Sequence, residues 1–213
     1  MEIKINADLL RLAAICASTE ETRYYLNGVY VEPHEDGVLL VATDGHRLVC
    51  LHDPDGAATG PAIIRTDKRF LRECKTAKNE SVPRLVRISG TVAGVYNDPE
   101  WTPDSVALTQ MSDALIDGTF PDWRRIVPEY HEGQCGGFNA KYLADFGKIA
   151  AELDTPAIQL RAKDEMSPAL VQLDSAGGFG VLMPMRTNNP KRLPDFMPQP
   201  EPAETEPAET ENA

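Results

Sequence analysis

Residues 38–52, VLLVATDGHRLVCLH, decide the fold of this chain. Two apolar, strand-like runs, 38–43 and 46–52, flank the dipeptide Asp44-Gly45. An Asp-Gly pair between two such runs is the strongest short-range signal for a β-hairpin. The preceding segment 24–32, YYLNGVYVE, has the same strand character, so we expect three consecutive strands in this region.

A helix is predicted before these strands. Ile3–Asn6 is a short apolar strand, Asn6 is a favoured N-cap residue, and 8–18 has the pattern of an amphipathic helix. The same order of strand, capping residue, helix and strands recurs twice more. The first unit has a leading strand at 3–6, the cap Asn6, a helix at 8–18 and strands at 24–32, 38–43 and 46–52. The second has a leading strand at 63–66, the cap Thr66, a helix at 67–79 and strands at 84–89, 92–97 and 105–110. The third has a leading strand at 137–139, the cap Asn139, a helix at 141–151 and strands at 157–162, 169–174 and 179–185. The expected unit is therefore β-α-β-β-β, used three times.

The spacing of these units predicts an α+β protein of one and a half domains. Residues 1–122 hold two units and form a complete domain, 123–136 are a linker, 137–186 form a half domain of one unit, and 187–213 are an extension. The extension ends in a disordered acidic tail, because 198–213 contain five Glu and four Pro but no Lys or Arg. The third unit has no partner in its own half domain, so we expect another chain or the first domain to cover it.

Composition argues against several classes of protein. The chain has 213 residues, of which 42% are hydrophobic, and a formal net charge of −12. It has no run of 18 apolar residues and no secretory signal at its start, so we expect a soluble, cytoplasmic protein without membrane contact. The four cysteines, Cys16, Cys50, Cys74 and Cys135, are too scattered for a disulfide framework or a zinc site, which predicts reduced thiols.

The sequence lacks the common catalytic motifs. It has no phosphate-binding, dinucleotide-binding or nucleophile-elbow motif, and its four histidines do not have metal-ligand spacing. Asp44 and His46 resemble an acid/base pair, but the hairpin turn accounts for Asp44. We therefore expect no catalysis, no metal and no cofactor, and an enzyme of unrecognised type is the least favoured hypothesis.

The predicted helices carry basic side chains in an otherwise acidic chain. The helix at 67–79 has five Lys or Arg against two acids, while the first helix contributes Arg11 and the third contributes Lys141 and Lys148. Mild, sequence-independent contact with DNA phosphates needs such a face. The alternative, for each helix taken alone, is an ordinary solvated face.

Five short motifs carry a resemblance to a known family. They are RYYLNG at 23–28, VATDGHRL at 41–48, DGTFPDWRR at 117–125, GFN at 137–139 and MPMR at 183–186. In this order they resemble the bacterial DNA polymerase III β subunit, the sliding clamp. The resemblance covers roughly residues 1–186 and corresponds to the second domain and the later half of the third domain of that family.

The resemblance implies a DNA-clamp fold, in which repeats assemble into a ring around duplex DNA and act as a processivity factor in DNA replication. Together with the helix charges, it implies DNA contacts from Arg11, Tyr24, Tyr25, Lys68, Arg72, Lys75, Lys141 and Lys148.

The resemblance also implies a groove that binds short peptides of DNA polymerases, the clamp loader and other factors. The residues implied for this groove are Leu26, Thr43, Gly45, His46, Arg47, Leu48, Pro121, Arg125, Ile126, Asn139, Tyr142, Val181, Leu182, Met183, Pro184, Met185 and Arg186. Leu and Met side chains supply adaptable apolar surface, and we expect Arg47, Arg125 and Arg186 to bind polar groups at the rim.

Two functional hypotheses stay open. In the first, the chain is a clamp that encircles DNA as a homo-oligomer, and a ring of twelve units then needs four copies. In the second, it is a decoy or adaptor that captures clamp-binding peptides without holding DNA, as the unmatched half domain and the acidic tail favour. In addition, Arg192–Met197, RLPDFM, approximates the Leu-x-x-Phe spacing of clamp-binding peptides and is a candidate occupant of the groove.

Overall fold

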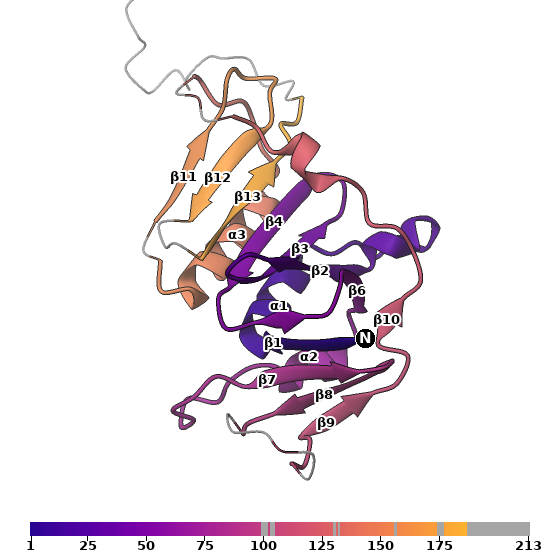
Figure 1. Cartoon of the computed structure of the whole chain (residues 1–213). Helices are drawn as coiled ribbons and strands as arrows, with labels where there is room; N and C mark the ends of the chain where they lie inside the picture. Colours follow the sequence, from indigo (N-terminus) through magenta and orange to yellow (C-terminus); the bar gives the residue numbers. More distant parts are fainter. Residues whose placement is uncertain are drawn as a thin grey trace, which may run out of the picture.

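The structure is a computed structural model that describes residues 1–98, 102, 105–129, 131, 133–155, 157–173 and 177–186. The predicted extension 187–213 lies outside the described residues. Within them the strands form two antiparallel sheets, one of five strands in the order β5-β1-β7-β8-β9 and one of eight in the order β10-β6-β2-β3-β4-β13-β12-β11 (Figure 1).

The elements have the following bounds. The five-stranded sheet contains β1 (Glu2–Asn6), β5 (Ala57–Ala58), β7 (Leu85–Ser89), β8 (Val92–Tyr96) and β9 (Thr109–Met111). The eight-stranded sheet contains β2 (Gly28–His34), β3 (Gly37–Thr43), β4 (Arg47–Asp53), β6 (Ala62–Arg65), β10 (Leu115–Ile116), β11 (Ile158–Arg161), β12 (Ala169–Leu173) and β13 (Gly178–Leu182). The α-helices are α1 (Ala7–Ala13), α2 (Lys68–Glu73) and α3 (Ala140–Glu152), and the 3₁₀ helices are η1 (Ala14–Cys16), η2 (Glu21–Leu26) and η3 (Trp123–Ile126).

The first two units exchange their leading strands. Strand β1 of the first unit pairs with β7 of the second, and β6 of the second pairs with β2 of the first. Each unit therefore completes the sheet of the other, which ties the two units together.

The third unit joins the first through its last strand. Strand β13 pairs with β4, with Val181 opposite Leu48 and Leu182 opposite Arg47. The eight-stranded sheet therefore continues from the first two units into the third (Figure 1). This confirms the expectation that the first domain covers part of the third unit.

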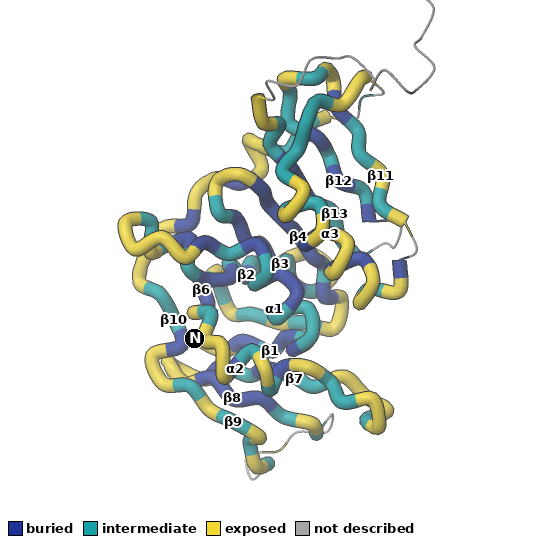
Figure 2. The backbone as a smooth tube through the Cα atoms, turned by 180° about the vertical axis from the view of Figure 1, so that it is seen from behind, coloured by how far each residue is buried: buried dark blue, intermediate teal, exposed yellow. Residues whose placement is uncertain are grey.

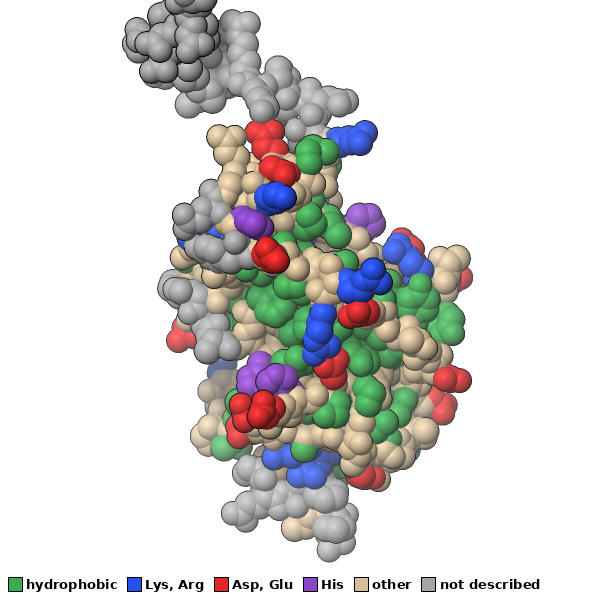
Figure 3. All heavy atoms as spheres, turned by 45° about the horizontal axis from the view of Figure 1, so that its top comes forward, with side chains coloured by type: hydrophobic (Ala, Val, Ile, Leu, Met, Phe, Trp, Pro, Cys, Tyr) green, Lys and Arg blue, Asp and Glu red, His purple; other side chains and the backbone are tan. Residues whose placement is uncertain are grey.

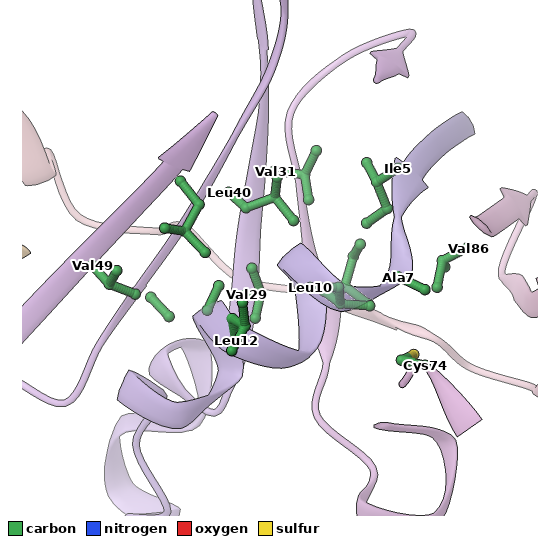
Figure 4. Packing of buried hydrophobic residues seen from close by; sticks show 14 of the residues in the cluster. Ile5, Ala7, Leu10, Leu12, Val29, Val31, Leu40, Val49, Cys74 and Val86 are labelled. Carbon is green, nitrogen blue, oxygen red and sulfur yellow. The ribbon is translucent and has the colours of Figure 1, made fainter. Parts of the chain in front are cut away.

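Apolar side chains of α1 fill the space between the two sheets. Leu10 and Leu12 are buried on α1 and belong to one cluster with Ile5 and Val86 of the five-stranded sheet and Val49 of the eight-stranded sheet (Figure 4). Each such side chain contributes roughly 1.5–3 kcal/mol when it is fully removed from water. The buried side chains of α1 and of both sheets thus form one shared core.

The N-cap of α2 differs from the sequence prediction. Asp67, and not Thr66, accepts hydrogen bonds from the backbone N–H groups of Arg69 and Phe70, both at 2.9 Å. The Thr66 hydroxyl instead donates to the carbonyl oxygen of Asn27, at 2.9 Å. The cap prediction for Thr66 is therefore wrong, because a neighbouring carboxylate takes the role and the hydroxyl ties the strand end to the first unit.

Helix α2 is also shorter than predicted. It ends at Glu73 instead of near Asn79, because the backbone N–H and hydroxyl of Thr76 donate to the carboxylate of Asp8 on α1. This contact turns the chain toward α1. In the same way, α1 ends at Ala13 and continues as the short helix η1.

The third unit lacks its predicted leading strand at 137–139. Helix α3 begins at Ala140 with Asn139 as its N-cap, as expected, but the residues before it are not in a strand. The carbonyl oxygen of Gly137 accepts from the backbone N–H of Met185 at 2.8 Å. This single contact replaces the ladder of a paired strand. In the second unit, the last strand also differs from the prediction, because β9 covers Thr109–Met111 instead of 105–110.

All four cysteines are free thiols. Burial raises the pKa of Cys16, Cys50 and Cys74 to about 12, so these three stay protonated at neutral pH, while Cys135 is exposed. Within the residues described, no helix has the length and apolar character that crossing a membrane needs.

Candidate functional site

The predicted groove residues meet where β4 and β13 lie side by side. Beyond the paired strands, the backbone N–H of Met183 donates to the carbonyl oxygen of His46 at 2.9 Å. The backbone N–H of Met185 donates to the carbonyl oxygen of Gly137, which attaches the same segment to the residues just before α3. We call the surface formed by the β3–β4 turn, 121–126, the start of α3 and 183–186 the inter-unit surface.

The β3–β4 turn has a fixed shape. Gly45 has a positive φ of 89°, which the Asp-Gly pair supplies, and the carboxylate of Asp44 accepts from the backbone N–H groups of His46 and Arg47 at 2.9 and 3.1 Å. The hydroxyl of Thr43 donates to the carbonyl oxygen of Arg47 at 2.7 Å. These bonds hold His46 on the surface, where its ring centroid lies 6.2 Å from that of Tyr142.

Arg47 lies inside the molecule and not at the rim. It is only 7% exposed, and its guanidinium donates to Asp145 of α3 at 2.6 Å, to the carbonyl oxygen of Ile15 at 2.8 Å and to Asp44 at 3.2 Å. It also lies 4.5 Å from the centroid of the Tyr142 ring. Arg47 therefore fastens the third unit to the first, and its donors serve this junction instead of the predicted contact with a ligand.

Asp145 completes this buried cluster. Burial by itself would raise the pKa of Asp145, but hydrogen bonds from Lys148 and Arg47, together with their charges, lower it below its ordinary value. Lys148 donates to the second carboxylate oxygen at 2.6 Å. The carboxylate thus stays charged and paired with two cations at neutral pH.

Three predicted groove residues belong to an apolar cluster on the face of the eight-stranded sheet that lies away from the helices. We call this cluster the apolar floor. Leu26, Leu48 and Val181 are buried in one cluster with Phe120 and Trp123, which come from the segment between β10 and η3 and from η3 itself. Leu182 points the opposite way, into the core beneath the helices. A ligand on this surface would therefore rest over covered side chains, and the exposed rim would make the direct contacts.

The segment over this floor is fastened by an ion pair. Arg124 binds the carboxylate of Glu32 on β2, and its guanidinium lies 4.3 Å from the centroid of the Trp123 ring. Trp123 itself is only 6% exposed. These contacts leave the neighbouring side chains of Pro121, Arg125 and Ile126 exposed.

The exposed part of the inter-unit surface has both apolar and basic groups. Met185 is 49% exposed and Met183 is half-buried. The exposed predicted residues are Gly45, His46, Pro121, Arg125, Ile126, Met185 and Arg186, and the half-buried ones are Asn139, Tyr142, Met183 and Pro184. Figure 3, which turns the third-unit end of Figure 1 toward the viewer, shows apolar side chains over a broad area with basic and acidic groups between them.

One hollow lies beside this surface, and a larger one lies on the other sheet. A cavity of about 250 Å³ lies beside it, lined by Val127, Pro128, Leu170, Gln172, Leu173, Gly178 and Phe179. Val127 follows Ile126 directly, and Phe179 packs in the same cluster as Val181. A larger cavity, of about 580 Å³, lies on the five-stranded sheet and is lined by other residues, among them Lys4, Thr59 and Tyr96.

The predicted DNA contacts lie on the helices, and several of them are already paired. Arg11 of α1 and Lys75, just beyond α2, both bind the carboxylate of Glu152 at the end of α3. This links the three helices, which Figure 2 shows on the side opposite to the view of Figure 1. Arg72 lies 3.4 Å from Glu73, and Lys148 binds Asp145.

Other predicted DNA contacts are open to solvent. Lys68 and Lys141 are exposed, Tyr24 is 53% exposed, and Tyr25 is half-buried with its ring edge-on to that of Tyr24. The helix face therefore offers cations to a polyanion, although its own acids neutralise part of that charge.

Sequence reasoning missed the residues that assemble the site. Asp145 was not singled out, and neither were Phe120 and Trp123, although the last two lie inside a quoted motif. The available signal for Trp123 was a large aromatic residue in a predicted linker. No sequence signal paired Asp145 with Arg47, which is 98 residues away.

Comparison with known proteins shows what the sequence and the fold resemble. Residues 2–64 match the family model described as the DNA polymerase III beta subunit, central domain. The beta sliding clamp of Caulobacter vibrioides is 33% identical over 130 residues, which cover 57% of this chain and 32% of the relative. Part of the chain is thus similar in sequence to the bacterial β sliding clamps. The beta sliding clamp of Synechococcus elongatus is 26% identical over 173 residues, covering 78% of this chain and 44% of that clamp.

Solved clamp structures share the fold. A sliding clamp of Pseudomonas aeruginosa with a ligand has a TM-score of 0.65 at 19% identity, covering 88% of this chain and 66% of that one. A clamp of Bartonella birtlesii bound to griselimycin has a TM-score of 0.60 at 23% identity and covers 87% and 66%. The fold is therefore the α+β sliding-clamp fold, and the chain spans about a third to under a half of the curated clamps named above.

Proposed function

We propose that this chain is a sliding-clamp-like scaffold of DNA replication, which acts in the cytoplasm without catalysis and binds short peptides of polymerases and other replication proteins at the inter-unit surface. The pairing of β4 with β13 carries this proposal, because it brings His46 of the first unit beside Met183 of the third. An apolar surface with a few polar groups suits an extended peptide that has apolar anchors.

The peptide proposal predicts a large effect of replacing the two methionines of the inter-unit surface, Met183 and Met185. Met183→Ala with Met185→Ala is expected to weaken binding of a peptide with a Leu-x-x-Phe core by roughly 10- to 100-fold, as for the loss of interface anchors. Fluorescence anisotropy of the labelled peptide measures this. Leu182 is not a suitable target because it lies in the core.

Met166→Ala is the matched control for this experiment. Met166 is 65% exposed in the turn between β11 and β12 of the same unit, away from the β4–β13 junction. Its replacement should leave the peptide affinity unchanged. Equal affinities for the native chain and the double methionine variant would place the peptide elsewhere.

The scaffold further encircles duplex DNA as a homo-oligomer in this proposal. The three helices meet at Glu152 and carry exposed cations, which supports a loose, sequence-independent contact with phosphates. A protein that encircles DNA is retained on closed circles and slides off linear molecules. Encirclement would be contradicted if the protein had a monomer mass at every concentration and were retained equally on circular and linear DNA, or on neither.

The helix cations provide a second test of DNA contact. Lys68→Glu with Lys141→Glu is expected to reduce the slope of log K against log salt by about two, because each phosphate contact contributes roughly one. The control, Arg65→Glu with Lys163→Glu, makes the same change of charge at exposed residues outside the helices. If both pairs weakened DNA binding equally, the attraction would be general and not a property of the helix face.

The decoy or adaptor is the second candidate function, and one observation favours it. Arg11, Lys75 and Lys148 are paired with Glu152 or Asp145, so the helix face has fewer free cations than the sequence suggests. Peptide binding by a chain that neither oligomerises nor binds DNA would favour this function over the encircling scaffold.

A further inference from the structure

The chain leaves the described residues at the inter-unit surface. Residues 183–186 line this surface, and Arg186, the last described residue, is exposed at its rim. The 27 residues that follow therefore start beside the site where a peptide is proposed to bind. A segment of these residues that binds the site is therefore tethered to it and does not have to diffuse to it from solution.

The composition of these residues identifies one apolar segment. Among 187–213, the large apolar side chains are Leu193, Phe196 and Met197, and the rest are small, polar, proline or charged residues. Leu193 is seven residues beyond Arg186, which gives it a reach of about 25 Å when the chain is extended. The single apolar cluster of the tail is thus within reach of the apolar residues that line the surface.

Charge also suits this contact. Arg125, Arg186 and His46 are exposed around the surface. Asp195 lies between the two apolar anchors of the segment, and five glutamates follow it in the tail. Arg192 balances Asp195 within the segment, while the five glutamates after it make the rest of the tail acidic. The exposed Arg125 and Arg186 attract these glutamates, and this attraction adds to the apolar contact.

We propose that residues 192–197 of the same chain occupy the inter-unit surface and compete with peptides of partner proteins. This inference rests on the proposed peptide-binding function. A tether of only a few residues gives an effective concentration in the millimolar range. For a segment with an intrinsic dissociation constant of about 0.1 mM, occupancy at about 1 mM weakens an external peptide roughly tenfold. The tail thus admits ligands that bind strongly and excludes weak ones.

The test compares full-length proteins. Leu193→Ala with Phe196→Ala removes both anchors, and Thr205→Ala with Thr210→Ala is a control in the same tail with unchanged charge. The probe is a fluorescein-labelled synthetic peptide with a Leu-x-x-Phe core and flanks unrelated to this chain. We expect the anchor variant to bind the probe about tenfold more tightly than the native chain, and the control to bind as the native chain does.

The outcomes separate the two proposals. Equal probe affinity of the native chain and the anchor variant overturns self-occupancy while the peptide-binding function stands. Failure of every form to bind the probe overturns the function as well. The tenfold difference should persist on dilution, because the segment acts within its own chain. A difference that disappears on dilution would mean that a neighbouring copy supplies the segment, and it would overturn the proposal.

Discussion

Replacing Asp145 by Ala is expected to lower the free energy of unfolding by about 3 to 5 kcal/mol, because it removes the carboxylate that pairs with the buried guanidinium of Arg47 on the α3 side. Arg47 would keep Asp44 and the carbonyl oxygen of Ile15, which do not replace the lost charge on the α3 side. Urea denaturation followed by circular dichroism measures the change. The loss should detach α3 from the first unit before the rest of the fold opens.

The control for this prediction is Asp36→Ala, an exposed carboxylate in the turn between β2 and β3, which should change stability by less than about 0.5 kcal/mol. If Asp145→Ala cost no more than the control, the Arg47 cluster would not hold the units together.

The pH dependence has a definite sign. Because the pKa of Asp145 is lowered in the folded state, its stabilising effect is complete above its unfolded pKa of about 3.9 and is lost as the pH falls through the folded value. Asp145→Asn should therefore flatten the acid limb of the stability curve. An acid limb as steep as that of the native chain would contradict the charge assignment.

Replacing Trp123 by Ala should have a similarly large effect, with a loss of about 3 to 5 kcal/mol in the free energy of unfolding. Trp123 is buried in one cluster with Leu48 and Val181, its ring centroid lies 6.3 Å from that of Phe179, and Arg124 covers its face. The substitution removes the side chain that closes the apolar floor over the β4–β13 junction. The same urea titration measures the loss.

Tyr24→Ala is the matched aromatic control, because Tyr24 is more than half exposed. Its replacement should cost less than about 1 kcal/mol. A cost of that size for Trp123→Ala would show that the segment around η3 rests on the sheet without contributing to its stability.

Local sequence signals predicted the elements of this fold well where a single interaction decides them. The Asp44-Gly45 turn and the caps at Asn6 and Asn139 all follow from short-range chemistry, and the structure confirms each. The prediction of Thr66 as the N-cap was wrong because two adjacent residues, Thr66 and Asp67, are both favoured N-cap residues. Local sequence cannot decide between them, because the hydroxyl of Thr66 has a distant hydrogen-bond partner, the carbonyl oxygen of Asn27.

Long-range assembly lay outside sequence reasoning. The exchange of β1 and β6 between units and the burial of Arg47 beside Asp145 depend on contacts between distant residues. The resemblance located the inter-unit residues as a set but did not indicate which of them are exposed. Leu48 and Val181 have the apolar character of contact residues, yet the structure covers them with Phe120 and Trp123. The packing of the segment from the end of β10 to η3 separates the buried floor from the exposed rim.

Methyl NMR of the native chain with ¹³C-labelled methionines tests the central claim most directly, since the methionines that the structure describes lie on more than one surface. On addition of a Leu-x-x-Phe peptide, we predict shifts of the Met183 and Met185 methyl signals, with those of Met111 and Met166 unchanged. Met1, whose sulfur accepts from the hydroxyl of Thr59 at the larger cavity, should also stay unchanged. Shifts of Met1 or Met111 with Met183 and Met185 unmoved would contradict the claim, because the peptide would then bind the five-stranded sheet.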